Sequence, residues 1–396
     1  MDKTKIKTLI KQVRGVSYKP DDLHNELNGD SVILLRANNI DDGKINFDDV
    51  VYVDKSKVSD EQYLRKGDIL ICASSGSKNL VGKAASVDFD RECTFGAFCK
   101  AVRPNEDVVD YLGVYFQSPV YRRKISEVAI GANINNIRNE HIDELEVPLF
   151  SRDEQQEIVK KIQLVLDIIS KRKDEISSLD DLIRARFVEM FGDPVNNEKG
   201  FVKAPMGDYM TLLTDFSSNG SYKTLDSGVT MYDEPNYAWM VRTTDLESGD
   251  MDSIKYIDEQ AYELLAKSKI FGGEIIMNKI GSAGKIYLMP KIDMPASLGR
   301  NAFMFRYDDR INVKFLYYLL TSDYGQREIQ QYVRGAVTKT ITKNDARAVL
   351  IIVPPIELQN EFEQFVEQVD KSKVAVQKAL DETQILFDSL MQKYFG

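Results

Sequence analysis

Apolar residues recur at alternating spacings of four and three along two long stretches of the chain, residues 153–192 and 356–396. Neither stretch contains Gly or Pro in its interior. This heptad pattern, sustained over about five repeats, predicts a long helix whose apolar seam packs on a partner. The seam positions are Ile158, Ile162, Val165, Ile169, Ile176, Leu179, Ile183 and Met190 in the first helix, and Phe362, Val366, Val369, Val376, Leu380, Phe387, Leu390 and Tyr394 in the second.

Polar residues interrupt the two seams at Arg172 and Arg186 in the first helix and at Lys373 and Thr383 in the second. Each predicted helix has about 36 residues and is therefore roughly 54 Å long. A helix cannot bury its own seam, and the matching lengths favour pairing of the two helices with each other. The alternative is that each seam packs on its own globular domain.

The segments that precede the helices have a mixed pattern. Short β-like runs at 68–72 and 275–277 are bounded by glycines and polar turns, and amphipathic stretches at 111–116 and 315–320 predict helices. The predicted fold class is therefore α+β. Its four parts are a mixed α/β domain at 1–152, a long helix at 153–192, a second mixed domain at 193–355 and a second long helix at 356–396.

The two halves of the chain repeat one another in order. Phe191-Gly192 matches Phe395-Gly396, which is an offset of 204 residues. Other matched pairs are residues 35–40 with 241–246, 67–71 with 273–277, Gly131-Ala132 with Gly335-Ala336, and Val147-Pro148 with Val353-Pro354. An ordered series of this kind indicates a duplicated architecture.

This plan resembles the specificity subunits of type I restriction-modification systems, and the resemblance covers the whole chain. In that family two target-recognition domains are each followed by a long helix, and the helices pair antiparallel as a spacer. The motifs that carry the resemblance are Arg36 and Arg242, the run 67–70 with its echo, the Gly-Ala loops, Gln155 and Gln359 at the helix starts, and the ending 191–194. Gly273-Glu274 departs from the Gly-Asp that is usual in the family.

The resemblance implies a subunit that chooses a DNA sequence and has no catalytic centre of its own. Each domain would read one half of a split target in double-stranded DNA, and the helices would set the gap. Methyltransferase subunits, two of them, and restriction-translocase subunits would be the partners. Those partners, and not this chain, would use S-adenosylmethionine, ATP and Mg²⁺.

Net charge changes this picture slightly. The formal charge is −10, which argues against DNA binding because phosphate contacts depend on Lys and Arg, although a local basic face can coexist with an acidic remainder. The three cysteines, Cys72, Cys93 and Cys99, form no disulfide framework. Without a leader-like start or a long apolar run, the sequence predicts a cytoplasmic protein.

Motifs for catalysis are missing. The adenine-gripping tetrad of methyltransferases is absent, since residues 353–356 read Val-Pro-Pro-Ile. Residues 281–285 resemble a phosphate loop only faintly. The two histidines, His24 and His141, are far apart, and no cluster suggests a metal site.

Polar, glycine-containing loops after strands are the candidates for DNA contact, because Arg, Asn, Lys and small hydroxyls suit base edges and phosphates. In the first half these residues are Arg36, Asn38, Ser74, Ser75, Ser77, Lys78, Asn79, Asn133, Asn135, Asn136 and Arg138. In the second half they are Arg242, Thr243, Thr244, Asn278, Lys279, Ser282, Arg334, Thr338, Lys339 and Thr340. Each could instead belong to an ordinary solvated turn, and the arginines Arg36 and Arg242 could form structural salt bridges.

Two other functions stay open. One is a single-chain restriction or modification enzyme of another type, which would need a catalytic motif. The other is a coiled-coil scaffold protein without DNA binding, which explains the helices but not the duplicated domains with polar loops.

Overall fold

The computed structural model describes residues 3–41, 43–77, 79–129 and 135–396. The chain divides into two compact units, and each unit takes one half of each long helix. Unit 1 comprises Met1–Glu175 and Val376–Gly396, and unit 2 comprises Ile176–Ala375. This division runs through the long helices, so it does not test the domain boundaries predicted at 152, 192 and 355, which stay predictions.

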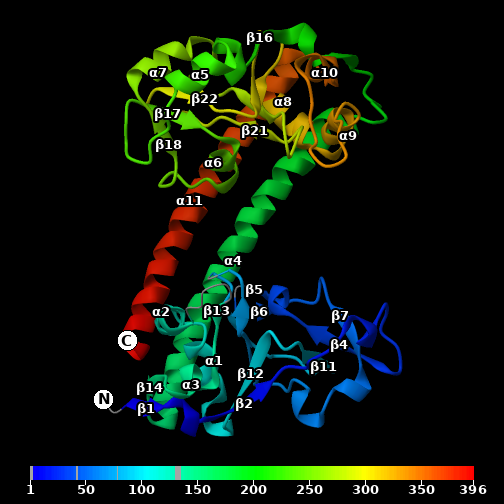
Figure 1. The fold of residues 1–396 in the computed structure, drawn as a ribbon. Coiled ribbons are helices and arrows are strands. Elements are labelled where there is room, and N and C mark those ends of the chain that lie inside the picture. Colours follow the sequence, from blue (N-terminus) through cyan, green and yellow to red (C-terminus); the bar gives the residue numbers. More distant parts are fainter. Residues whose placement is uncertain (1–2, 42, 78, 130–134) are drawn as a thin grey trace. The chain divides into compact units, whose positions relative to one another are not determined.

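Unit 1 contains two four-stranded sheets in its described part (Figure 1). The first sheet has the order β10-β8-β12-β2 and is antiparallel throughout. The second has the order β11-β4-β7-β3, with β11 parallel to β4. The strands of the first sheet are β2 (Ile10–Arg14), β8 (Ile69–Cys72), β10 (Ala84–Ser86) and β12 (Cys99–Pro104), and those of the second are β3 (Leu23–His24), β4 (Ser31–Leu35), β7 (Val51–Asp54) and β11 (Cys93–Phe95).

Unit 2 repeats this plan, which confirms the duplication read from the sequence. One sheet has the order β16-β23-β20-β21, and the other has the order β18-β17-β22-β19 with β17 and β22 parallel. The strands are β16 (Met210–Asp215), β20 (Ile275–Asn278), β21 (Ile286–Leu288), β23 (Ala302–Tyr307), β17 (Ala238–Val241), β18 (Lys255–Ile257), β19 (Lys269–Ile270) and β22 (Ala296–Leu298).

A two-stranded antiparallel ladder joins the start of each unit's globular part to the strand before its long helix. These strands are β1 (Lys3–Lys5) with β14 (Glu146–Pro148), and β15 (Val202–Pro205) with β24 (Leu350–Val353). The amphipathic stretches predicted to be helical are helices α1 (Val109–Tyr115) and α8 (Val313–Thr321). The helices α2 (Pro119–Val128) and α9 (Asp323–Gln330) follow them.

The long helices are α4 (Arg152–Phe191) and α11 (Ile356–Phe395), each of 40 residues and slightly longer than expected. Ser151 caps α4 in a reciprocal pair with Glu154, because the Ser151 backbone N–H donates to Glu154 Oε2 at 2.9 Å and the Glu154 N–H donates to Ser151 Oγ. Gly192 ends the helix with a left-handed φ of 72°, as the glycine after the seam predicts.

Within each unit the two helices run antiparallel. In unit 1, Phe150 lies beside Tyr394, with ring centroids 6.3 Å apart, and Arg172 donates to Thr383 Oγ1. In unit 2, the Phe187 ring lies 5.4 Å from that of Phe362.

The seams of the long helices pack on the globular parts as well as on each other, so both packing partners considered from the sequence are present. In unit 1, Ile158, Ile162, Val165 and Ile169 belong to one core with α1 residues and with Phe387 of α11. In unit 2, Ile183, Met190, Phe362, Val366 and Val369 form one core with α8 residues. Several aromatic and Met residues outside the predicted seam complete these cores, namely Phe187, Phe191, Met391 and Phe395.

The seam loosens toward the middle of both helices. Ile176, Leu179, Val376 and Leu380 are only half-buried, whereas most seam residues nearer the globular parts are buried, with Leu390 and Tyr394 as half-buried exceptions. The globular parts therefore supply much of the apolar surface that buries each seam.

Candidate nucleic-acid interface

Two loops that lie far apart in the first half of the sequence pair with each other in unit 1. β9 (Ser74–Ser75) and β13 (Asn135–Asn136) form an antiparallel ladder in which Ser75 faces Asn135 and Ser74 faces Asn136. Ser74 Oγ donates to Asn136 Oδ1 at 3.2 Å, and the Ile137 N–H donates to the Ala73 carbonyl at 2.8 Å. The two candidate loops therefore form one surface element.

Helix α2 holds the backbone of the loop that follows β9. Arg122 donates to the carbonyl of Val81 at 2.6 Å and to that of Asn79 at 3.0 Å. These two hydrogen bonds hold the loop backbone against α2, and the side chains of Ser77 and Asn79 are exposed. Arg138 is also exposed. Lys78 and Asn133 lie outside the described residues.

Unit 2 brings the corresponding loops together in the same way. Arg334 and Thr340 exchange backbone hydrogen bonds of 2.9 and 2.7 Å, so residues 334–340 form a tight hairpin. The Gly281 N–H donates to the Lys339 carbonyl at 3.0 Å, and the Ile341 N–H donates to the Lys279 carbonyl at 3.1 Å. The hairpin therefore lies against the loop after β20, as β13 lies against β9.

Hairpin 334–340 is exposed along most of its length, and Val337 at its tip is 98% exposed. Thr338, Lys339 and Thr340 are exposed on it without a side-chain partner among the described residues, whereas Arg334 donates to Asp345 at 3.2 Å. Such a combination of hydroxyl and ammonium groups on a protruding hairpin can contact base edges and phosphates.

The loop after β20 exposes fewer of its predicted contact residues to solvent than the hairpin does. Asn278 is buried, and its Nδ2 donates to the Tyr287 hydroxyl at 3.4 Å. Lys279 is mostly covered, whereas Ser282 is exposed. Asn278 therefore supports the loop from inside in this structure, and Ser282 is the predicted contact residue that lies at the surface.

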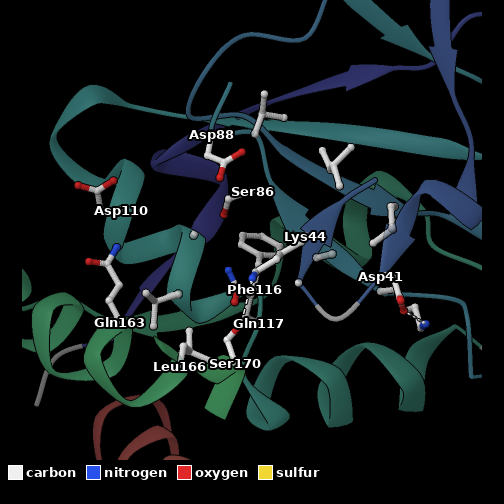
Figure 2. A pocket seen from close by; sticks show the side chains of 18 of the residues that line it. Asp41, Lys44, Ser86, Asp88, Asp110, Phe116, Gln117, Gln163, Leu166 and Ser170 are labelled. Atoms are coloured by element: carbon white, nitrogen blue, oxygen red, sulfur yellow. Dashed lines mark hydrogen bonds and ion pairs between the residues drawn. The ribbon is translucent and has the colours of Figure 1, made fainter. Parts of the chain in front are cut away.

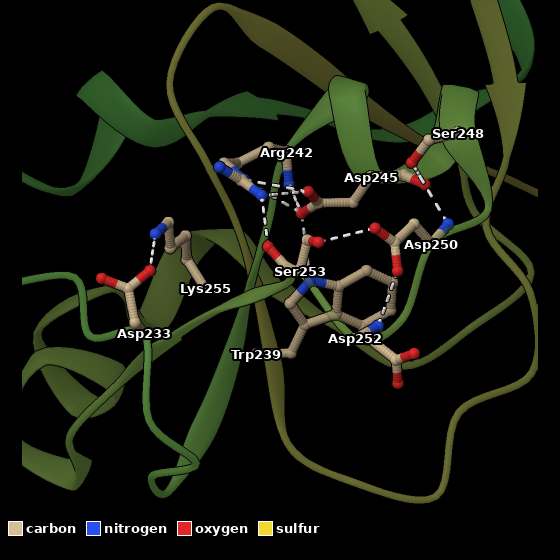
Figure 3. Close-up of polar contacts among 9 residues, drawn as sticks. All are labelled: Asp233, Trp239, Arg242, Asp245, Ser248, Asp250, Asp252, Ser253 and Lys255. Carbon is tan, nitrogen blue, oxygen red and sulfur yellow. Dashed lines mark hydrogen bonds and ion pairs between the residues drawn. The ribbon is translucent and has the colours of Figure 1, made fainter. Parts of the chain in front are cut away.

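Arg242, at the end of β17, forms a structural ion pair, the alternative that the sequence left open (Figure 3). Its Nη2 and Nε donate to Asp245 Oδ1 at 2.5 and 2.9 Å, and Nη2 also donates to the Ser253 carbonyl at 2.9 Å. Asp245 is buried and also accepts from the Trp239 indole N–H at 3.3 Å. Thr243 and Thr244 begin the short helix α6 (Thr243–Ser248) beside this pair.

Arg36, at the matched end of β4, is paired as well, but near the surface. Its Nη2 donates to Asp49 Oδ2 at 2.8 Å, and Asn38 Nδ2 donates to the same oxygen at 2.9 Å. Asp49 is 75% exposed. Both arginines therefore follow a buried strand and pair with a carboxylate of their own unit.

A carboxylate that no sequence pattern indicated connects the loops of unit 2. Asp215 ends β16 and is buried, and it accepts hydrogen bonds from Lys279 Nζ and Lys343 Nζ, each at 2.8 Å. Ser217 and Ser218 donate to it at 2.7 and 2.6 Å. Burial raises the pKa of Asp215, but these four donors outweigh it and hold the pKa well below its usual range. The two lysines lie 64 and 128 residues away, so no local pattern could have indicated them.

A cavity of 1280 Å³ lies elsewhere in unit 1, between the globular part and the two helices (Figure 2). Lys44, Asp88 and Asp110 line it from the globular side, and Gln163 and Ser170 line it from α4. Its charges are of both signs, and it includes none of the paired loops. Over the residues that the structure describes, no group of three or more His, Cys, Asp or Glu could hold a metal ion.

The three cysteines are buried and unpaired with one another. Burial raises the pKa of the Cys93 thiol to about 12, which is the state of an inert structural cysteine. Within the described ranges, no helix is long and apolar enough to cross a membrane.

Comparison with known proteins gives one consistent family. The model of the type I restriction modification DNA specificity domain matches residues 18–178 and 208–383. The chain is 27% identical to the type I restriction enzyme EcoKI specificity subunit of Escherichia coli K12 over 412 residues, covering 98% of this chain and 87% of the relative. It is also 27% identical to the StySPI specificity subunit of Salmonella potsdam over 417 residues, with the same two coverages.

Solved structures share the fold. The type I restriction-modification S subunit from M. genitalium matches with a TM-score of 0.51 at 15% identity, covering 100% of this chain and 96% of that chain. A chain from a study of complex assembly and conformational transition of the type I R-M system matches with a TM-score of 0.55 at 17% identity, covering 100% and 97%.

Proposed function

The chain belongs to the family of type I restriction-modification DNA specificity proteins, and from this premise we propose that it reads a split DNA target, one half-site with each unit. The observation that carries the proposal is the pair of polar loops that each unit holds together, β9 with β13 in unit 1 and residues 278–282 with hairpin 334–340 in unit 2. Because the side chains of the two loop pairs differ, the two half-sites should differ in sequence.

The antiparallel long helices support a second part of the proposal, which is that they set the unread gap between the half-sites. Two reading domains joined by a helical spacer fix half-site separation in the way that paired DNA-binding modules do. The chain would also hold two methyltransferase subunits and the restriction-translocase subunits. S-adenosylmethionine, ATP and Mg²⁺ would serve those partners.

The proposal separates this chain from its two alternatives. A single-chain restriction or modification enzyme would methylate or cut DNA without a partner. A coiled-coil scaffold would bind no DNA with or without one. The paired polar loops favour a DNA-binding protein over a coiled-coil scaffold, because a scaffold function does not require duplicated, exposed polar loops.

Methylome sequencing tests the proposal. Cells that express the chain together with its methyltransferase subunits should carry methylated adenines in one motif with two defined half-sites and an undefined gap. Cells that express either component alone should lack this motif, and the purified chain should neither methylate nor cleave DNA. A continuous motif, or methyl transfer by the chain alone, would contradict the proposed function.

A further inference from the structure

Asp215 connects three segments of unit 2 that the sequence separates. It is the last residue of β16, while Lys279 directly follows β20 and Lys343 begins α10 (Lys343–Ala348), just after hairpin 334–340. Since Ile341 is also bonded to the Lys279 carbonyl, the ion pairs and the backbone bonds hold the same loops together.

The carboxylate of this cluster is buried, whereas its two lysines are partly exposed. The Asp215 side chain is 5% exposed, whereas Lys279 and Lys343 are 18% and 33% exposed. A buried carboxylate needs opposite charges around it, and here two ammonium groups supply them. Each ammonium that is held by Asp215 is one that is less available to neutralise a DNA phosphate.

We propose that Asp215 is a positioning residue for DNA recognition by unit 2. It fixes hairpin 334–340 for base reading, and it withholds the charges of Lys279 and Lys343 from the DNA backbone. Phosphate contacts strengthen binding to every sequence alike, so restraining them favours the specific target over random DNA. This inference rests on the proposed function.

The described part of unit 1 lacks this arrangement. Its strand β2 ends in Arg14, which faces Lys100 across the sheet, where Asp215 faces Phe303 in unit 2. Arg14 is exposed. The effect of Asp215 should therefore be confined to the half-site that unit 2 reads.

The test compares Asp215→Asn with Asp233→Asn in the complex with the methyltransferase subunits. Asp233 is 83% exposed and pairs with Lys255, so its variant removes the same charge from unit 2 without touching the loops. Binding would be measured by titration on a library of targets with randomised half-sites and on random duplex, at several salt concentrations. Thermal melting of each complex would be recorded in parallel.

For Asp215→Asn we expect one half-site to lose its base preference while the other keeps it. Affinity for random duplex should rise about 3- to 10-fold at about 0.1 M salt, and the salt dependence should steepen by about one to two phosphate contacts, because freeing a lysine adds roughly 0.9 to the slope. Asp233→Asn frees Lys255, which lies on β18 outside the paired loops, so this variant should change none of these. A purely structural role of Asp215 would instead lower specific and random affinity together, and that result would overturn the inference.

Two further outcomes distinguish a failure of the proposed function from a failure of the inference about Asp215. If the wild-type complex reads no split target, the proposed function and this inference both fall. If the wild type reads both half-sites and Asp215→Asn does so equally well, only the inference falls. Should Asp215→Asn not fold, Lys343→Gln removes one arm of the cluster, and we expect the same loss of one half-site without the rise in random binding. Unchanged half-sites in Lys343→Gln would also overturn the inference.

Discussion

At the scale of single residues, Asp245 is the hydrogen-bond acceptor for the polar groups at the end of β17. It accepts from the Trp239 indole, from the Arg242 backbone N–H at 3.0 Å and from the Arg242 guanidinium. Removing a buried acceptor leaves its donors unpaired, which costs more than the hydrogen bonds themselves contributed. Arg242 therefore stabilises the turn after β17 through its contacts with Asp245 and the Ser253 carbonyl.

Asp245→Ala should lower the free energy of unfolding of unit 2 by about 2–3 kcal/mol, because a partly buried guanidinium and an indole N–H lose their acceptor. Trp239 is the single tryptophan of the chain, so urea titration followed by tryptophan fluorescence reports this region directly. Asp233→Ala is the matched control and should cost under about 1 kcal/mol, since its ion pair is exposed. Equal losses in the two variants would contradict this account of Asp245.

At the scale of elements, the polar interruptions of the two seams have partners on the opposite helix. In unit 1, Arg172 donates to Thr383 Oγ1 and to the Ala379 carbonyl. In unit 2, Arg186 pairs with Glu361 at 3.0 Å, and Lys373 pairs with Asp180 at 2.6 Å. Polar residues at seam positions specify register and orientation in coiled coils, and we expect these pairs to do so for the antiparallel arrangement.

A double-mutant cycle of Arg172→Ala and Thr383→Ala tests this role. Because the two side chains are in direct contact across the helices, we expect a coupling energy of about 0.5–2 kcal/mol in urea unfolding followed by circular dichroism. The control cycle uses Arg184 and Asp181, an exposed pair on α4 itself, where the coupling should stay under about 0.5 kcal/mol. Additive losses at Arg172 and Thr383 would show that the contact does not specify the pairing.

The paired loops predict reciprocal effects on the two half-sites. Replacing Thr338, Lys339 and Thr340 with Ala should blur only the half-site that unit 2 reads, and replacing Asn133, Asn135 and Asn136 should blur only the other. Each lost base contact typically costs about 1–3 kcal/mol of discrimination. Selection from a randomised target library measures both motifs at once. If either triple variant blurs both half-sites equally, its residues act on phosphates or on folding.

At the scale of the whole molecule, the proposed spacer makes the gap between half-sites depend on helix length. Each unit takes about half of α4 and half of α11, so the sequence boundary between the units lies at 175/176 in one helix and 375/376 in the other. These two places are the natural sites for changing the spacer without touching either globular part.

Inserting four residues at both places should lengthen each helix by roughly 6 Å, about one turn. Base pairs stack at about 3.4 Å, so the methylated motif should gain about one or two base pairs in its gap while the read bases stay the same. Inserting four residues in one helix only is the control, and it should abolish methylation because the helices no longer match. A methylome with an unchanged gap and normal activity from the double insertion would rule out the helices as the spacer.

The sequence by itself determined the duplicated plan, the two long helices, most positions of their seams and their ends, and these are the features that depend on local spacing. A heptad repeat and a glycine stop act within a few residues, so the places of Ile158, Phe362 and Gly192 in their helices follow from the sequence alone. Several strands and short helices were predictable for the same reason.

Only the tertiary structure decided which loops pair, which arginines form ion pairs within the protein and which side chains hold hairpin 334–340 in place. Ser74 meets Asn136, Arg242 meets Ser253, and Asp215 meets Lys343 through contacts between segments separated in sequence. Ion pairs and hydrogen bonds at such separations leave no periodic trace, because their geometry is fixed by the packing of sheets and helices and not by neighbouring residues. That is why the candidate loops could be predicted from sequence, while the buried carboxylate that connects them in unit 2 could not.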